Sequence, residues 1–307
     1  MKKIENKQII VIAGPTASGK TMLAIDIAKE VNGEIINADS RSIYREMDIG
    51  TGKPARQLTV YGLQTTDYLV DGVPHHLFDI KNPDEDFNVS EFKNLAKEKI
   101  TEIQNSKHIP IIVGGTGLYI DAMVYDYKMP STTPDKAMRK ELDSRETEDL
   151  FKELKKIDPE TAKKIDPKNK RRIMRALEIY YQTKKSKVTQ ETKKKLPKDV
   201  LYFAIQIPRE ELYAKINKRV EGMFMVQKLD DEVKKLLKKY SADLPIMQTM
   251  GYKESAQFLN KESTLEEAIQ KTQQAHRNYA KKQMTWFRRN KDIVWIKPDI
   301  NNIKKYL

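Results

Sequence analysis

A phosphate-binding loop lies near the start of the chain. Residues 14–21 read Gly14-Pro15-Thr16-Ala17-Ser18-Gly19-Lys20-Thr21, which fits the pattern G-x-x-x-x-G-K-[ST]. An apolar segment typical of a strand precedes this loop, and a segment with helical spacing follows it, so backbone N–H groups should converge on an anion at the start of a helix. Lys20 would add a positive charge, and the Thr21 hydroxyl could bind Mg²⁺. The loop therefore predicts a diphosphate or triphosphate ligand.

Two further loops with reactive side chains follow predicted strands. Asp39 comes directly after the strand-like segment 34–38, and Thr116 lies in a glycine-rich turn after the apolar segment 109–113. Ligands of open parallel sheets bind at the carboxyl ends of the strands, so these loops should meet the phosphate loop at one crevice. Asp39 could act there as a general base or help to hold a metal, and an N-cap of a helix is the alternative. The glycines beside Thr116 would allow close approach of a ligand.

Other residue types lead to weaker predictions. His75 and His76 are adjacent, so on a strand they would face opposite sides, and no Cys or acidic partner stands at metal-ligand spacing. We therefore expect them to make structural hydrogen bonds. Arg219 could be a surface cation or could clamp an anion, and its spacing does not decide between the two.

The composition sets limits on the class of protein. A chain of 307 residues can bury a substantial core and should form about two domains. It contains no cysteine, which excludes disulfides and thiolate metal sites. The first residues lack the apolar region of a signal peptide, and the apolar run at 9–13 is too short to cross a bilayer. We expect a soluble cytoplasmic protein that does not contact membranes.

The order of the predicted elements suggests a split domain. Strand and helix patterns alternate over the first 125 residues, as in a parallel α/β sheet. Segment 130–134 is typical of a linker, charged helical patterns follow it, and strand character returns at 201–207. We predict an α/β fold with a phosphate-loop NTPase-like core at 1–129 and 201–307 and a helical insertion at 130–200.

The predicted insertion is strongly basic. Residues 151–200 contain 17 Lys and Arg against 7 Asp and Glu, while the whole chain carries a net charge of +13. A local excess of this kind is typical of surfaces that bind a polyanion such as RNA. The alternative is a solvated lysine-rich surface.

In combination, the motifs resemble those of the bacterial tRNA dimethylallyltransferase family. The matching segments run in order through nearly the whole chain, at 14–21, 38–44, 47–54, 74–77, 114–119, 172–178, 250–252 and 279–288. Members of the family transfer a dimethylallyl group from dimethylallyl diphosphate to N6 of the adenosine at tRNA position 37, next to the anticodon. The resemblance thus implies that the phosphate loop holds a leaving diphosphate.

The resemblance also implies roles for individual residues. Lys20, Mg²⁺ at Thr21 and Arg219 would stabilise the negative charge that grows on the diphosphate. Asp39 would accept the proton of the attacking amine or orient it, and Thr116 would contact the donor near its bridging oxygen. The prenyl group needs an apolar slot without water, and the sequence does not identify its lining.

The resemblance further implies contacts with the tRNA anticodon stem-loop. We expect the protein to be a monomer. Ser42 stands where many members of the family have glutamine, so its backbone could serve in place of a side-chain contact. The implied tRNA contacts are Asp39, Ser40, Arg41, Ser42, Thr116, Arg139, Arg171, Arg172, Ile173, Met174, Arg175, Gln248, Thr249, Met250, Gly251, Tyr252 and Lys253.

Three other functions compete with this one. They are a phosphate-loop nucleotide kinase, an isopentenyltransferase acting on free adenine nucleotides, and an ATP-gated RNA-binding protein without catalysis. The basic insertion argues against an enzyme of small nucleotides, and Asp39 with Thr116 argues against a role in binding alone.

Overall fold

The computed structural model describes residues 8–60, 63–130, 132–133, 135–190, 192 and 194–307, with only the backbone for 58–60 and 63–67. It divides into two compact units. The core unit comprises the described residues up to Val124 together with Leu196–Leu307, and the helical unit comprises Tyr125–Lys195. This division falls five residues before our sequence boundaries at both ends. Ser131 and Pro134 of the predicted linker and the first seven residues lie outside the described residues.

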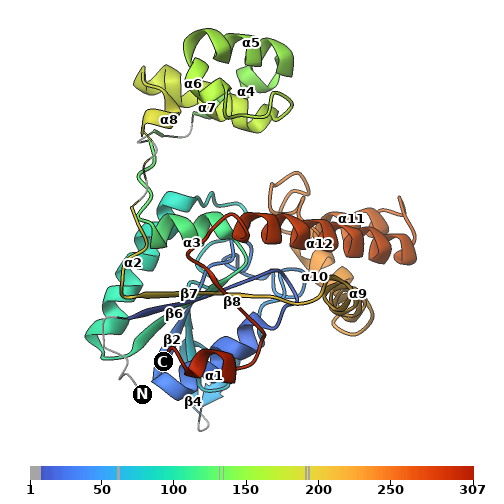
Figure 1. Ribbon diagram of the computed structural model, residues 1–307. Coiled ribbons are helices and arrows are strands. Elements are labelled where there is room, and N and C mark those ends of the chain that lie inside the picture. The colour runs from blue at the N-terminus through green and yellow to red at the C-terminus, as the bar shows by residue number, and fades with distance from the viewer. Residues whose placement is uncertain (1–7, 61–62, 131, 134, 191, 193) are drawn as a thin grey trace. The chain divides into compact units, whose positions relative to one another are not determined.

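The core unit is built on one sheet of eight strands in the order β3-β4-β5-β2-β6-β1-β7-β8 (Figure 1). Strands β5, β2, β6, β1, β7 and β8 pair in parallel, and β4 pairs antiparallel with β3 and β5. The predicted α/β fold with a parallel sheet is thus confirmed. The strands are β1 (Ile9–Ala13), β2 (Gly33–Asn37), β3 (Gln57–Val60), β4 (Leu63–Val70), β5 (Val73–His76), β6 (Ile109–Gly114), β7 (Val200–Ile205) and β8 (Val294–Ile296).

The centre of the sheet is apolar on both faces. Strand β1 lies between β6 and β7, and Val11 is in register with Ile112 on one side and Tyr202 on the other. Parallel strands covered by helices on both faces have such continuous apolar sequences. Helix α1 (Lys20–Val31) covers one face, and α2 (Val89–Asn105) lies with α3 (Gly117–Val124) on the other (Figure 1).

Four helices of the core unit form a second apolar cluster beside the sheet. Helix α12 begins with a capping box, in which the Thr264 hydroxyl accepts the Glu267 N–H and the Glu267 carboxylate accepts the Thr264 N–H. Its far end reaches the glycine-rich turns after β1 and β6. These helices are α9 (Arg209–Met225), α10 (Leu229–Leu237), α11 (Tyr252–Leu259) and α12 (Leu265–Phe287), and a short α13 (Asn301–Lys304) ends the fold.

The helical unit has its own apolar core. Leu150 and Leu154 pack there with Ile173 and Leu177, and all four are buried. The unit contains α4 (Lys136–Asp143), α5 (Thr147–Ile157), α6 (Pro159–Ala162), α7 (Lys170–Thr183) and α8 (Lys187–Gln190). In the described part of the chain, no helix is both long and apolar enough to cross a membrane.

Candidate active site at the carboxyl edge of the sheet

A pocket at the carboxyl ends of β1, β2 and β6 brings the predicted loops together. Lys20 and Thr21 line it from the phosphate loop, Asp39 from the loop after β2, and Arg219 from α9. The predicted convergence of the loops is therefore present. Because Arg219 lies in this pocket, it is not the surface cation that the sequence left as an alternative.

The phosphate loop has the backbone conformation of an anion cradle. Gly14 and Gly19 have φ angles of 147° and 90°, and Ala17 also has a positive φ of 60°. A Cβ atom at Gly14 would lie 3.3 Å from the backbone nitrogen of Ile205, so this position has little space for a side chain. Helix α1 starts at Lys20, within the loop sequence, and no side chain caps it. Its first N–H groups are consequently available to an anion.

Two cations share the pocket with one carboxylate. The Lys20 Nζ donates to the Pro15 carbonyl at 2.7 Å, and the Arg219 guanidinium donates to Thr16 Oγ1 at 3.3 Å. Burial lowers the pKa of Lys20 to about 8, with Asp39 acting against the shift and Arg219 adding to it. Burial also lowers the pKa of Arg219, again with Asp39 acting against it. The pocket thus has an excess of positive charge that an anionic ligand would neutralise.

Asp39 stands in a tight turn. Its Oδ1 accepts the Arg41 N–H at 2.9 Å, and its own N–H donates to Asn37 Oδ1 at 3.1 Å. Residues 39–46 form turns and a bridge with no helix. The helix N-cap alternative is therefore wrong. The Asp39 side chain instead stabilises an Asx-turn, in which it accepts the N–H two residues later.

Thr116 connects the loops after β2 and β6. Its Oγ1 accepts the Ser40 N–H at 3.0 Å, and its N–H donates to the Ala38 carbonyl at 3.3 Å. A Cβ atom at Gly114 would lie 2.2 Å from that carbonyl oxygen, so only glycine permits this approach. Asp39 is thereby held next to the glycine-rich turn.

Helix α12 contributes two site residues that our sequence analysis missed. Gln283, 5% exposed, accepts the Thr16 N–H at 2.8 Å and donates to the Gly115 carbonyl at 2.9 Å. The Tyr279 hydroxyl hydrogen-bonds with Thr116 and Gln283, and burial raises the pKa of Tyr279. Both residues lie in the matched segment 279–288, where their spacing of four residues places them on one face of the helix.

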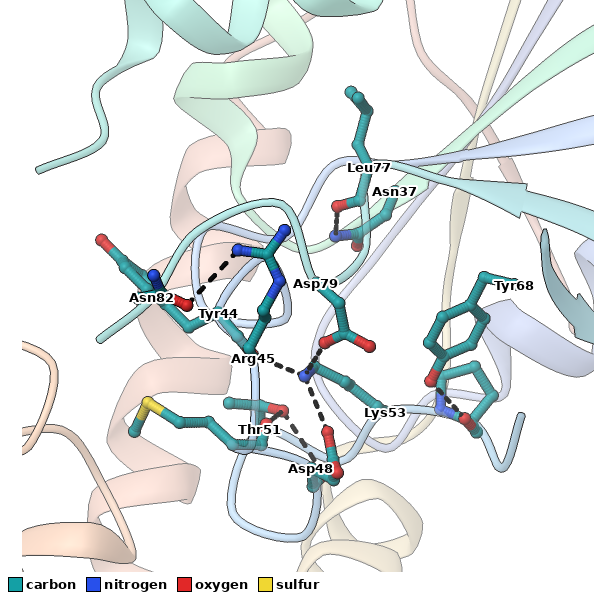
Figure 2. Close-up of polar contacts among 12 residues, drawn as sticks. Asn37, Tyr44, Arg45, Asp48, Thr51, Lys53, Tyr68, Leu77, Asp79 and Asn82 are labelled. Carbon is teal, nitrogen blue, oxygen red and sulfur yellow. Dashed lines mark hydrogen bonds and ion pairs between the residues drawn. The ribbon is translucent and has the colours of Figure 1, made fainter. Parts of the chain in front are cut away.

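A buried lysine holds the loop that contributes Thr51, Gly52 and Pro54 to the pocket lining. The Lys53 side chain is 0% exposed, and its Nζ donates to Asp48 Oδ1 at 2.7 Å, Asp79 Oδ1 at 2.5 Å and the Tyr44 carbonyl at 2.5 Å. Figure 2 shows the lysine between the two carboxylates, which come from different turns of the chain. Lys53 therefore joins the loop before β3 to the turn after β5.

Part of the pocket lining is apolar. Ile35, Pro54, Phe78 and Val113 line the pocket together with His75. The His75 ring is buried, its Nδ1 lies 2.9 Å from the Val73 carbonyl, and burial lowers its pKa. An uncharged ring suits this apolar environment.

The adjacent histidines have different environments. His76 Nε2 lies 2.6 Å from Glu34 Oε2, in a hydrogen bond outside the pocket lining. The structural hydrogen bond predicted for His76 is thus present. His75 makes its predicted hydrogen bond to the backbone and also lines the pocket, which the sequence analysis did not foresee.

Comparison with known proteins identifies the family. Residues 42–290 match the IPP transferase family, and residues 7–73 match the isopentenyl transferase family. The chain belongs to the IPP transferase family. The tRNA dimethylallyltransferase of Anoxybacillus flavithermus is 42% identical over 94% of this chain and 90% of its own length. That of Acetivibrio thermocellus is 42% identical over 97% of each chain.

Solved structures of IPP transferases have the same fold. The tRNA isopentenylpyrophosphate transferase of Bacillus halodurans is 39% identical over 97% of this chain and 93% of its own, with a TM-score of 0.68. A eukaryotic dimethylallyltransferase that acts on tRNA is 28% identical over 96% of this chain and 75% of its own, with a TM-score of 0.79. The resemblance drawn from the motifs is confirmed.

In this IPP transferase, the arginines implied as tRNA contacts have different environments. Arg171 and Arg172 are exposed at the start of α7. Arg139 Nε and Arg175 Nη1 instead lie 2.9 Å and 2.6 Å from the carboxylate of Glu178, which is 1% exposed. Burial alone would raise the pKa of Glu178, but the hydrogen bonds from both arginines hold it below its usual range.

Two of the implied tRNA contacts need correction. Ile173 is 0% exposed in the apolar core of the helical unit, and Tyr252 is 0% exposed in the core unit, where its hydroxyl donates to Glu232. Neither side chain is available to a ligand. A matching motif identifies positions in the sequence but does not show whether their side chains are exposed.

The other implied tRNA contacts differ in exposure. Gln248 and Lys253 are exposed and Thr249 and Met250 are partly exposed, whereas Gly251 is buried. Of the other implied contacts, Met174 and Ser40 are partly buried, Arg41 is exposed and Ser42 lines the pocket.

The buried lysine leads to a stability prediction. Lys53→Met should lower the free energy of unfolding by about 2–3 kcal/mol, because three oxygen acceptors lose their common donor. Urea unfolding would measure this change. Lys29→Met, on the exposed side of α1, is the control and should be nearly neutral. Equal effects of the two substitutions would show that the Lys53 ion pairs add nothing to stability.

Proposed function

We propose that this protein catalyses dimethylallyl transfer to tRNA with the diphosphate of its donor bound at the phosphate loop. The dimethylallyl group passes from dimethylallyl diphosphate to N6 of the adenosine at tRNA position 37, and diphosphate is released. The observation that carries the assignment of the donor site is the placement of Lys20 and Arg219, two half-buried cations, beside the uncapped N–H groups at the start of α1.

The donor would lie along the pocket. Its diphosphate would contact the phosphate loop, Lys20 and Arg219, and its prenyl group would extend toward the apolar side chains of Phe78 and Val113 in the same lining. As the bond between C1 and the bridging oxygen breaks, its electron pair moves to the diphosphate, where fixed cations in a dry site stabilise the new charge. The apolar lining would keep water from the allylic cation.

Asp39 would act on the acceptor, and Thr116 would contact the donor. The lone pair of N6 attacks C1, and the amine then loses a proton. Because the Arg41 N–H binds Asp39 Oδ1, the Oδ2 atom can accept this proton or orient the amine. Thr116 is positioned beside Asp39 through Ser40 and would contact the donor near its bridging oxygen.

Magnesium would bind mainly to the diphosphate. The Thr21 hydroxyl and the Asp39 carboxylate are oxygen ligands in the same pocket, and no group of three His, Asp or Glu residues in the described ranges could hold a metal by itself. This ligand set fits Mg²⁺, which retains several waters and binds substrate phosphates. Thr21 would hold the ion, which would supply charge stabilisation to the leaving group.

The anticodon stem-loop of tRNA would be the bound part of the acceptor. The exposed Arg171 and Arg172 and the basic composition of residues 151–200 support phosphate contacts by the helical unit. Gln248 and Lys253 are the exposed candidates of the core unit. The relatives named above act on tRNA, which disfavours the kinase and the binding-only alternative.

A comparison of three acceptors tests the proposed function. Radiolabelled dimethylallyl diphosphate would be supplied with undermodified tRNA, AMP or ATP in parallel reactions. We expect label in tRNA alone. Label in AMP or ATP would instead support an enzyme of free adenine nucleotides.

The role of Asp39 is testable with a nearly isosteric variant. Asp39→Asn should lower kcat by about 10²-fold, the scale of lost general-base catalysis. The amide oxygen can still accept the Arg41 N–H, so the turn and the affinity for tRNA should persist. Single-turnover kinetics and filter binding would measure both quantities. Normal turnover would limit Asp39 to its role in the turn.

The lowered pKa of Lys20 predicts a pH dependence. Below a pH of about 8 Lys20 is protonated in the free protein, and above it the charge is lost, so kcat/KM for the donor should fall as the pH rises through this value. Lys20→Arg should move the decline to higher pH, because a guanidinium stays charged. An unchanged decline in this variant would exclude Lys20 as its source.

The exposed arginines predict a salt effect. Replacing Arg171 and Arg172 with glutamine should weaken tRNA binding and reduce the slope of log Kd against log salt by about one for each lost phosphate contact. As a control, Lys152 and Lys163 of the same unit, which pair with acids on their own helices, would be replaced by glutamine. Equal slopes for both double variants would contradict a specific role of the arginine pair.

A further inference from the structure

The loop formed by residues 47–54 contacts the cation that we assign to the diphosphate. Thr51, Gly52 and Pro54 of this loop line the pocket. The Gly52 carbonyl accepts a hydrogen bond from Arg219 Nη2 at 3.3 Å. Gly52 has a φ of 66°, and a Cβ atom there would lie 1.4 Å from the same nitrogen. The position of the loop therefore determines where the Arg219 guanidinium can lie.

One carboxylate outside the pocket holds this loop. Glu232 Oε2 accepts the N–H groups of Asp48 at 3.0 Å and Ile49 at 2.9 Å, and Oε1 accepts that of Gly50 at 3.4 Å. Three successive N–H groups thus converge on one carboxylate, and hydrogen bonds to a carboxylate are stronger than those between neutral groups. Glu232 is on α10 and is not among the residues that line the pocket.

Tyr252 completes the attachment of the loop. Its hydroxyl donates at 2.7 Å to Glu232 Oε1, the oxygen that also accepts the Gly50 N–H. The ring packs so closely that a Cβ atom at Gly50 would lie 2.4 Å from Tyr252 Cε2. The backbone at Gly50 consequently rests against the ring, while Lys53 fixes the end of the loop through Asp48 and Asp79 (Figure 2).

We infer that Glu232 is a positioning residue of the donor site, which holds the 47–54 loop so that the Gly52 carbonyl keeps Arg219 directed toward the phosphate loop. This inference rests on the function proposed above. Among the described residues, the half-buried Arg219 guanidinium donates to Thr16 and to Gly52, each at 3.3 Å, so the Gly52 carbonyl is one of its two hydrogen-bond acceptors. When the loop is released, Arg219 loses the Gly52 carbonyl as a fixed acceptor. Binding of the diphosphate is then weaker, because stabilisation of its charge depends on a fixed position of the guanidinium.

Diphosphate binding tests the inference in the absence of tRNA. Titration calorimetry with inorganic diphosphate and Mg²⁺ would compare the unmodified protein with three variants. Glu232→Gln, which keeps the size but removes the charge, should raise Kd about 10-fold, equal to about 1.4 kcal/mol. Tyr252→Phe removes one of the four hydrogen bonds that the Glu232 carboxylate accepts, and it should raise Kd about 3-fold. Asp231→Asn, at an exposed neighbour on α10, should leave Kd unchanged.

A second measurement separates positioning from a purely structural role. Glu232→Gln should raise KM for dimethylallyl diphosphate by a factor similar to that for Kd and leave the affinity for tRNA unchanged. If this variant does not fold, Tyr252→Phe provides the test through the same two constants. Unchanged diphosphate affinity in the folded variants, with only a lower Tm, would overturn the inference. Failure of the unmodified protein and of Asp231→Asn to bind diphosphate would instead overturn the proposed donor site.

Discussion

The site depends on the burial of two cations next to a single carboxylate. Lys20 and Arg219 lie in the same pocket, and burial lowers the pKa of both, while only Asp39 among the charged residues that line the pocket acts against this shift. Holding these charges away from water costs free energy, and an anionic ligand offsets that cost. Cations held in this way would stabilise a diphosphate that develops further negative charge as it leaves.

The rest of the core unit keeps the cations in place. The apolar strands β1 and β6 fix the two turns that form the site, and Gln283 bridges these turns from α12 with hydrogen bonds of 2.8 and 2.9 Å. Lys53 holds the 47–54 loop, whose Gly52 carbonyl contacts Arg219. Gln283 and the Lys53 side chain are buried and hydrogen-bonded. They therefore restrict the movement of the turns and the loop that surround Lys20 and Arg219.

The sequence revealed the central strands and the loops that carry Lys20, Asp39 and Thr116, because continuous apolar runs followed by glycine or polar residues identify buried parallel strands. Strands β3 and β4 were missed, since polar residues interrupt their apolar pattern and their pairing is antiparallel at one edge of the sheet. Gln283 and Tyr279 were missed as site residues because a polar residue in a helix is usually exposed. Ile173 and Tyr252 were assigned to tRNA although both are buried, which a motif match cannot reveal.

The most direct test of the donor site is a crystal structure with an unreactive thiolo analogue of dimethylallyl diphosphate and Mg²⁺. The account predicts that diphosphate oxygens lie within hydrogen-bonding distance of Lys20 Nζ, the Arg219 guanidinium and the first N–H groups of α1. It also predicts that the prenyl carbons contact Phe78 and Val113. A diphosphate bound away from the phosphate loop, or prenyl carbons directed to solvent, would contradict it.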